Sequence, residues 1–118
     1  MHDFKKMKVW QKARELAKNI YIVTSNFPKE EIFGLTSQMR RSAVSIASNI
    51  AEGSGRNTDG EFINFLGIAN GSSFELETQL MIALDLGYIS DSESVALQQD
   101  LVEIQKMLFT FISKLKSK

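Results

Sequence analysis

Residues 38–56 have the sequence QMRRSAVSIASNIAEGSGR, which predicts a single helix with two unlike faces. At about 100° of rotation per residue, the apolar side chains in and just before this segment fall on one stripe. This core stripe consists of Leu35, Met39, Ala43, Ile46 and Ile50. The polar stripe on the opposite side consists of Gln38, Arg41, Ser45, Ser48, Asn49, Glu52 and Arg56. Its short Ser and Asn side chains are typical either of a solvated helix surface or of a face that another backbone approaches closely.

Helical patterns continue on both sides of this segment. Apolar residues at helical spacing predict helices over about residues 8–25, 35–52, 59–86 and 91–115. The single proline, Pro28, lies between the first two of these segments, which favours an all-helical chain because proline interrupts helix interiors. The connections are short, so successive helices should be antiparallel neighbours. We therefore predict an all-α, antiparallel up-down-up-down four-helix bundle in which residues 1–118 form one domain.

Local signals mark the ends of these helices. Phe27 ends the first helix, since the residue before a proline disfavours helical backbone angles. Glycines are expected to end the next two, Gly53 and Gly55 after the second helix and Gly87 after the third. Capping boxes are predicted to open the third and fourth helices. These boxes are residues 58–61 (TDGE) and 90–93 (SDSE).

Composition narrows the class of protein. The chain of 118 residues is long enough to bury a core, and its 43% apolar content does not suit a disordered protein. It has no cysteine, which excludes disulfides and thiolate metal sites and suits a reducing compartment. No apolar stretch follows the N-terminal lysines, so a signal peptide is not expected. No apolar run approaches the roughly 20 residues that span a bilayer, and we expect a cytoplasmic protein outside the membrane.

The zero net charge conceals an asymmetry between the two halves of the chain. Residues 1–59 contain ten Lys or Arg and six Asp or Glu, which gives +4, whereas residues 60–118 contain four and eight, which gives −4. Such a split either holds the two halves together or presents a basic surface to an anionic partner.

The third and fourth helices carry more apolar residues than one small bundle can bury. Phe74 and Met81 lie away from the core stripe of the third helix, and three residues spaced by seven lie away from that of the fourth. Those three residues are Val95, Val102 and Phe109. Exposed apolar patches of this kind usually mark a protein interface. We therefore predict that these five residues form the interface of a homo-oligomer.

The sequence offers little for catalysis or for metal binding. The only histidine is His2, near the chain end, and there is no cysteine nucleophile. No Glu-x-x-His pair of the di-iron bundle type is present. The stretch Gly53-Ser54-Gly55-Arg56 is not a P-loop, because no Gly-Lys-Ser/Thr follows it. We expect no catalytic residue, metal, cofactor or small-molecule substrate.

The polar stripe of the second helix suggests a structural role. Its short side chains, with Arg41 or Arg40 available as a basic partner for Glu75 of the third helix, predict a partly buried, charge-paired network. The residues of this network are Arg41, Ser45, Asn49, Glu52 and Glu75.

Short motifs spread over residues 4–115 together resemble a known family. They are Val9-Trp10-Gln11-Lys12-Ala13, Tyr21, Phe27-Pro28-x-Glu30, Gly34-Leu35-x-x-Gln38-x-Arg40-Arg41-Ser42-Ala43-x-Ser45-Ile46, Asn49-Ile50-Ala51-Glu52-Gly53, Arg56, Glu61-Phe62 and Gly71-Ser72-x-x-Glu75-Leu76-Glu77-Thr78-Gln79-Leu80. The set resembles the 23S rRNA-intervening-sequence protein family, small four-helix-bundle proteins that are similar to the accessory protein of diversity-generating retroelements. This sequence has Phe33 where the family has Tyr, and Ala47 where it often has Pro; neither change touches a charged position.

The resemblance implies a four-helix bundle assembled into a closed ring, a pentamer in the characterised shape. It also implies association with nucleic acid, because members are encoded within rRNA intervening sequences and the retroelement relative acts with a reverse transcriptase and RNA. Together with the basic first half of the chain, this makes five residues candidates for phosphate contacts. These residues are Lys12, Arg14, Lys18, Arg40 and Arg56. The alternative is a structural or protein-interaction module that binds no nucleic acid; an enzyme is the third and least favoured class.

Overall fold

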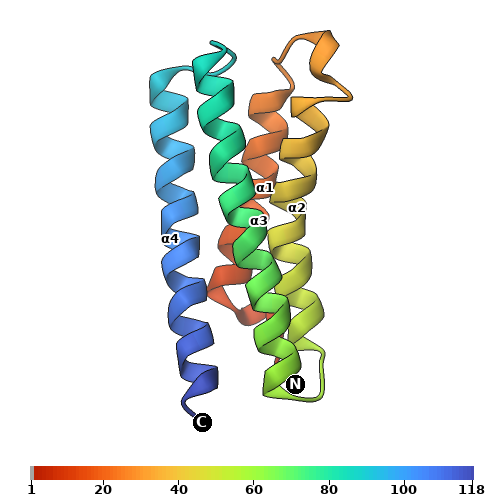
Figure 1. The fold of residues 1–118 in the computed structure, drawn as a ribbon, viewed down its shortest axis with the longest axis vertical. Coiled ribbons are helices and arrows are strands. Elements are labelled where there is room, and N and C mark those ends of the chain that lie inside the picture. The colour runs from red at the N-terminus through yellow and green to blue at the C-terminus, as the bar shows by residue number, and fades with distance from the viewer. Residues whose placement is uncertain (1) are drawn as a thin grey trace.

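The computed structural model describes residues 2–118, in which four long helices account for most of the chain. The helices are α1 (Lys8–Thr24), α2 (Leu35–Ser54), α3 (Asp59–Asp85) and α4 (Asp91–Lys116). Two short 3-10 turns precede α1 and α2, namely η1 (Phe4–Lys6) and η2 (Lys29–Glu31). The helices run side by side, and the chain reverses direction between each and the next (Figure 1). The structure confirms the all-α class, and each helix end lies within two residues of its predicted position.

Each helix packs against two others around a single core. α1 lies beside α2 and α4, and α3 lies beside α2 and α4, while the backbones of the diagonal pairs stay more than 8 Å apart within residues 2–118. In Figure 1, α3 lies in front, α2 and α4 flank it, and α1 lies behind. The predicted core stripe of α2 is fully buried at Met39, Ala43, Ile46 and Ile50. Removing such side chains from water is the main source of stability of a bundle of this size.

The two predicted capping boxes differ in the structure. At the start of α4, Ser90 Oγ accepts the backbone N–H of Glu93, and the Glu93 carboxylate accepts the backbone N–H of Ser90. At the start of α3, Thr58 Oγ1 accepts the backbone N–H of Glu61, but the Glu61 carboxylate accepts the Thr58 hydroxyl instead of its N–H. The box at α3 is therefore only half formed, because the hydroxyl competes with the backbone for the same carboxylate.

Gly53 does not end α2, contrary to the prediction. The helix continues to Ser54, with Gly55 as its C-cap residue. A Cβ atom at Gly53 would lie 2.7 Å from Phe65 Cβ and 2.8 Å from Phe62 Cδ1. Glycine is therefore needed here for the close approach of α3 and not for the backbone angles of a helix stop. Gly87 does take the predicted left-handed conformation after α3, with φ of 76°.

Side-chain contacts close both ends of the bundle. At one end, the backbone N–H of His2 donates to the Ser54 carbonyl at 3.0 Å, and the His2 ring lies 4.9 Å from the ring of Phe62. At the other end, Glu31 accepts the Tyr88 hydroxyl at 3.0 Å and the backbone N–H of Leu35 at 3.1 Å. The hydrogen bond to Glu31 raises the pKa of Tyr88 above its ordinary value of 10.0. The hydrogen bond between Tyr88 and Glu31 joins the α3–α4 turn to the α1–α2 connection.

Candidate interaction surfaces

Three of the five predicted phosphate-binding residues contact a neighbouring helix of the same chain. Lys12 Nζ lies 3.1 Å from a carboxylate oxygen of Glu103, so this ion pair joins α1 to α4. Arg40 Nε donates to Thr24 Oγ1 at 2.9 Å, and its guanidinium lies over the ring of Tyr21 at 4.6 Å. Both residues therefore fasten α1 to a neighbouring helix.

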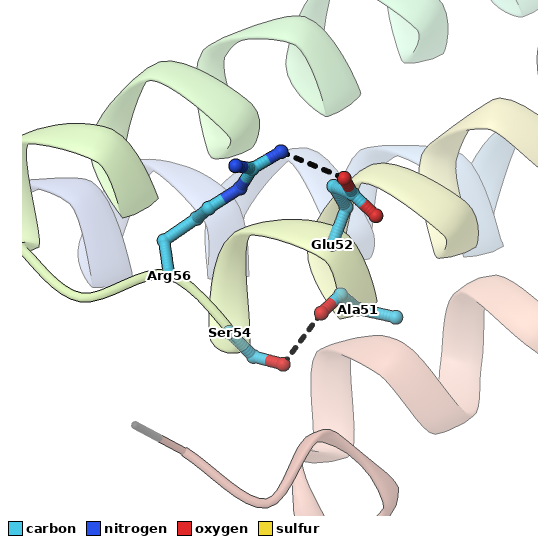
Figure 2. A network of polar contacts seen from close by, with 4 residues as sticks. All are labelled: Ala51, Glu52, Ser54 and Arg56. Carbon is cyan, nitrogen blue, oxygen red and sulfur yellow. Dashed lines mark hydrogen bonds and ion pairs between the residues drawn. The ribbon is translucent and has the colours of Figure 1, made fainter.

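Arg56 is the third, and it lies just beyond the end of α2. Its Nη2 donates to Glu52 Oε1 at 2.7 Å, and its guanidinium lies 4.7 Å from the centre of the Phe65 ring. Figure 2 shows this pair. Beside it, the Ser54 hydroxyl donates a hydrogen bond to the Ala51 carbonyl within the last turn of α2. Arg40 lies in the first half of α2 and Arg56 beyond its end, so the structure does not gather the five residues into one site.

Arg14 and Lys18 form part of a basic surface on α1. Arg14 is exposed and lies 5.6 Å from the Trp10 ring, while Lys18 pairs with Glu15 at 3.4 Å with its side chain 65% exposed. Three further exposed lysines, which the sequence motifs did not indicate, lie in η1 and at the first residue of α1. They are Lys5, Lys6 and Lys8. Their close spacing in the sequence was the signal that could have identified them. We call these five residues the α1 basic surface.

The predicted polar network is only partly formed in the single chain. Ser45 Oγ and Ser72 Oγ share a hydrogen bond of 2.9 Å between α2 and α3. Asn49 Nδ2 donates to the Ser45 carbonyl at 2.8 Å and to Ser45 Oγ at 2.9 Å. Ser72 was not predicted as a member, although it belongs to the stretch of small residues that interrupts the apolar pattern of α3. The short side chains thus bring α2 and α3 together.

The charged members of the predicted network lie outside it in the single chain. Glu52 pairs with Arg56. Arg41 and Glu75 are exposed, and neither takes part in an ion pair among the residues that the structure describes. The reason is geometric: Ser45 and Asn49 lie next to α3, whereas Arg41 points away from the bundle and stays in water. Within one subunit, the prediction of a buried Arg41–Glu75 pair is therefore wrong.

This arrangement predicts unequal effects of two alanine substitutions. Asn49→Ala should lower the free energy of unfolding by about 1 kcal/mol, because it removes hydrogen bonds from a half-buried seam. Glu75→Ala should change it by less than about 0.5 kcal/mol in the isolated chain, because the side chain is exposed. Urea denaturation of both variants at low protein concentration measures the difference. Equal losses would show that Glu75 is held within the subunit.

All five predicted interface residues are exposed. Phe109 is the most exposed of them, at 72%, and the others are exposed by 40% or more. They flank the seam between α3 and α4, where the Glu77 side chain accepts a hydrogen bond from Gln105 at 2.9 Å. We call this set the α3–α4 face. It consists of Phe74, Met81, Val95, Val102 and Phe109.

A second exposed apolar set lies on the opposite side of α3. Ile68 and Ile82 are expected at the edge of the core from their spacing, yet they are 52% and 44% exposed. At about 100° per residue, they point toward the α2 side of the helix, as does Glu75. We call Ile68, Ile82 and Glu75 of α3, together with Arg41 of α2, the α2–α3 face. Sequence spacing sets these residues apart from the core stripe, but only the packing of α2 against α3 decided that they stay exposed.

Residues 2–118 contain no cluster of side chains suited to a metal ion. No group of three or more His, Cys, Asp or Glu side chains is placed to hold a metal ion there. The His2 ring packs against the rings of Phe62 and Phe111. Among the described helices, none is long and apolar enough to cross a membrane.

Comparison with known proteins identifies the family. The model of the family described as 23S rRNA-intervening sequence protein matches residues 5–110. The chain belongs to this family. Among solved structures, the chain is similar to a protein of unknown function from the S23 ribosomal protein family of Bacteroides thetaiotaomicron, with 31% sequence identity and a TM-score of 0.80. The match covers 88% of this chain and 97% of that one. No curated protein matches the chain.

Membership of the 23S rRNA-intervening sequence protein family confirms the resemblance seen in the sequence motifs. The structural match extends over nearly all of the solved relative, so the four-helix arrangement belongs to the relative as well. Neither description names an enzymatic activity.

Proposed function

We propose that this protein is a non-enzymatic, self-associating helical bundle that binds RNA or another nucleic acid through the α1 basic surface. One observation carries the proposal. Lys5, Lys6, Lys8, Arg14 and Lys18 are all exposed on η1 and α1. Only Glu15, paired with Lys18, offsets these charges within α1. Exposed lysines and arginines along one helix are suited to successive phosphates.

Self-association would strengthen such a surface. Each copy contributes a modest patch, and a ring of five copies, as the family resemblance implies, repeats it around the assembly. Several weak contacts to one strand then act together, which raises the overall affinity without any new contact. The family description refers to 23S rRNA, and a nucleic-acid partner agrees with it.

Neutralising the α1 basic surface should weaken nucleic-acid binding and flatten its dependence on salt. In Arg14→Gln/Lys18→Gln, each lost phosphate contact should reduce the slope of log affinity against log salt by about one. The measurement is fluorescence anisotropy with structured RNA, single-stranded DNA and duplex DNA at several salt concentrations.

The matched control is Lys116→Gln/Lys118→Gln, which removes the same charge from the C-terminal end of the chain. It should keep most of the binding, because Lys118 pairs with Asp59 at the start of α3 and neither lysine belongs to the α1 basic surface. Equal losses in both variants would show that net charge matters and not the α1 basic surface. Light scattering on all samples ensures that the same assembly is compared.

The alternative is a structural or protein-interaction module without nucleic-acid binding. It is favoured by the internal contacts of Lys12, Arg40 and Arg56, which use three of the predicted phosphate-binding residues to hold the bundle together. This alternative would replace the nucleic-acid proposal if the unmodified protein showed no salt-sensitive binding to any of the three nucleic acids.

A further inference from the structure

Two aromatic rings, each with an arginine against it, lie along the α1–α2 side of the bundle. The guanidinium of Arg14 lies 5.6 Å from the centre of the Trp10 ring, and that of Arg40 lies 4.6 Å from the centre of the Tyr21 ring. Trp10 is partly exposed, and Tyr21 is 46% exposed. Tyr21 follows Trp10 by eleven residues, which is about three helical turns, so both rings lie on one flank of α1, about 16 Å apart along its axis. We call these four residues the α1–α2 aromatic surface.

The turn η1 supports the Trp10 end of this surface. The Phe4 ring meets the Trp10 ring at 69°, with ring centres 5.0 Å apart. Gln11 Nε2 donates to the Lys5 carbonyl at 2.9 Å, which fastens η1 to the first turns of α1. The exposed lysines Lys5 and Lys6 are thereby held near Trp10. The phosphate contacts proposed above use the charges of this region but leave its aromatic rings without a role.

A polar pocket of about 140 Å³ borders the Tyr21 end. Two cations and three hydroxyl side chains line it, namely Arg40, Lys29, Thr24, Ser25 and Thr36. Arg40 Nε donates to Thr24 Oγ1 at 2.9 Å, and this bond holds the guanidinium where it both contacts the Tyr21 ring and lines the pocket. A guanidinium beside an ammonium group suits a phosphate. A nucleotide can therefore place its base on Tyr21 and its phosphate in the pocket, with Arg40 in contact with both.

The carboxylates of α1 and α2 lie away from this surface. Glu15 is the only acid of α1, and at about 100° per residue it lies roughly 140° around the helix from Trp10. Glu52 is the only acid of α2, and it pairs with Arg56, whose guanidinium lies on the Phe65 ring of α3. Positive charge and flat aromatic faces thus occur together. The surface is complementary to a ligand that carries negative charges and flat rings.

We propose that the α1–α2 aromatic surface binds single-stranded RNA, with one unpaired base stacked on the Trp10–Arg14 pair and another on the Tyr21–Arg40 pair. This inference rests on the proposed function and names the class of nucleic acid that the chain prefers. In a duplex each base is stacked on its neighbours about 3.4 Å away, so its faces are not available. The bases of a single strand are accessible, and aromatic rings and arginine side chains bind their faces. Lys18 is exposed between the two pairs, where it can contact an intervening phosphate.

The fluorescence of Trp10 tests the stacking directly. Trp10 is the only tryptophan of the chain, so its emission reports on this ring alone. A short oligouridylate should quench the emission, and the quenching should saturate together with the binding that anisotropy measures. A duplex RNA of the same length should bind through its phosphates and leave the emission nearly unchanged, because its bases cannot reach the ring.

Tyr21→Leu removes the second stacking ring and keeps the Trp10 reporter. It should weaken the binding of the oligouridylate by about tenfold, as expected for the loss of one stacked base, and leave the affinity for the duplex unchanged. Tyr21→Phe is the matched control, because it keeps the ring and loses only the hydroxyl group. It should bind the oligouridylate like the unmodified chain, and circular dichroism checks that both variants are folded.

The outcomes separate this inference from the proposed function. Binding of the oligouridylate without quenching of Trp10, or equal affinities of Tyr21→Leu and Tyr21→Phe, would overturn base stacking while leaving the phosphate contacts in place. Equal quenching by the duplex would overturn the preference for a single strand. Failure of the unmodified chain to bind either RNA would overturn RNA binding itself, and this inference with it.

Discussion

Phe62→Ala is expected to lower the free energy of unfolding by about 3–5 kcal/mol, the usual cost of emptying the site of a buried aromatic ring. Phe62 is 2% exposed and packs edge-to-face on Phe111 of α4, with ring centres 5.2 Å apart. The His2 ring also packs on it, with ring centres 4.9 Å apart. The loss is a large share of the roughly 5–15 kcal/mol that stabilises a domain. Urea denaturation followed by circular dichroism measures it.

Phe33→Ala is the matched control for this substitution. Phe33 lies in the connection between α1 and α2 and is 93% exposed. Its replacement should change the free energy of unfolding by less than about 0.5 kcal/mol, as surface substitutions usually do. Similar losses at both positions would show that Phe62 does not hold the end of the bundle together.

Gly53→Ala is expected to be the second most damaging substitution, with a loss of about 2 kcal/mol. The added methyl group would lie 2.7 Å from Phe65 Cβ, an atom attached directly to the backbone of α3. Relief therefore requires the helices to separate and not merely a side-chain rotation. Overpacking of this kind costs about 1–3 kcal/mol, which exceeds the gain of up to about 1 kcal/mol from replacing glycine in a helix.

The same substitution at Gly71 should have the opposite sign. Nothing lies within 4 Å of a Cβ atom there, so Gly71→Ala should stabilise the isolated chain by up to about 1 kcal/mol. Both substitutions are best compared at low protein concentration, so that self-association does not contribute to the measured stability. A stabilising Gly53→Ala would contradict the close packing of α2 on α3.

Helix positions were predictable because they depend on neighbours in sequence. Ser90 and Glu93 form their capping box within four residues, and Gly87 adopts its left-handed angle within the turn that it ends. The core stripe of α2 followed from spacing alone, since a helix turns by the same angle wherever it lies. Gly53 shows the limit of this reasoning, because its role depends on Phe62 and Phe65 of another helix.

The candidate surfaces were predictable only in part. The exposure of Phe109 and Val102 followed from an apolar stripe that one core could not cover. The engagement of Lys12 by Glu103 could not be foreseen, because the two residues lie on different helices far apart in the sequence. The same is true of Arg40 and Thr24. The sequence around a basic residue does not reveal whether its side chain is free or paired with a residue of another helix.

By itself, the sequence determined the all-α class, the places where helices begin and end, the family motifs and a surplus of apolar residues on α3 and α4. These properties depend on spacing and on turn chemistry within a few residues. Only the tertiary structure decided which charges are paired, that Arg41 and Glu75 stay apart from the seam joined by Ser45 and Ser72, and that Ile68 and Ile82 are exposed. The physical reason is that pairing and burial are set by the rotation and height of one helix against the next, and no residue carries that information alone.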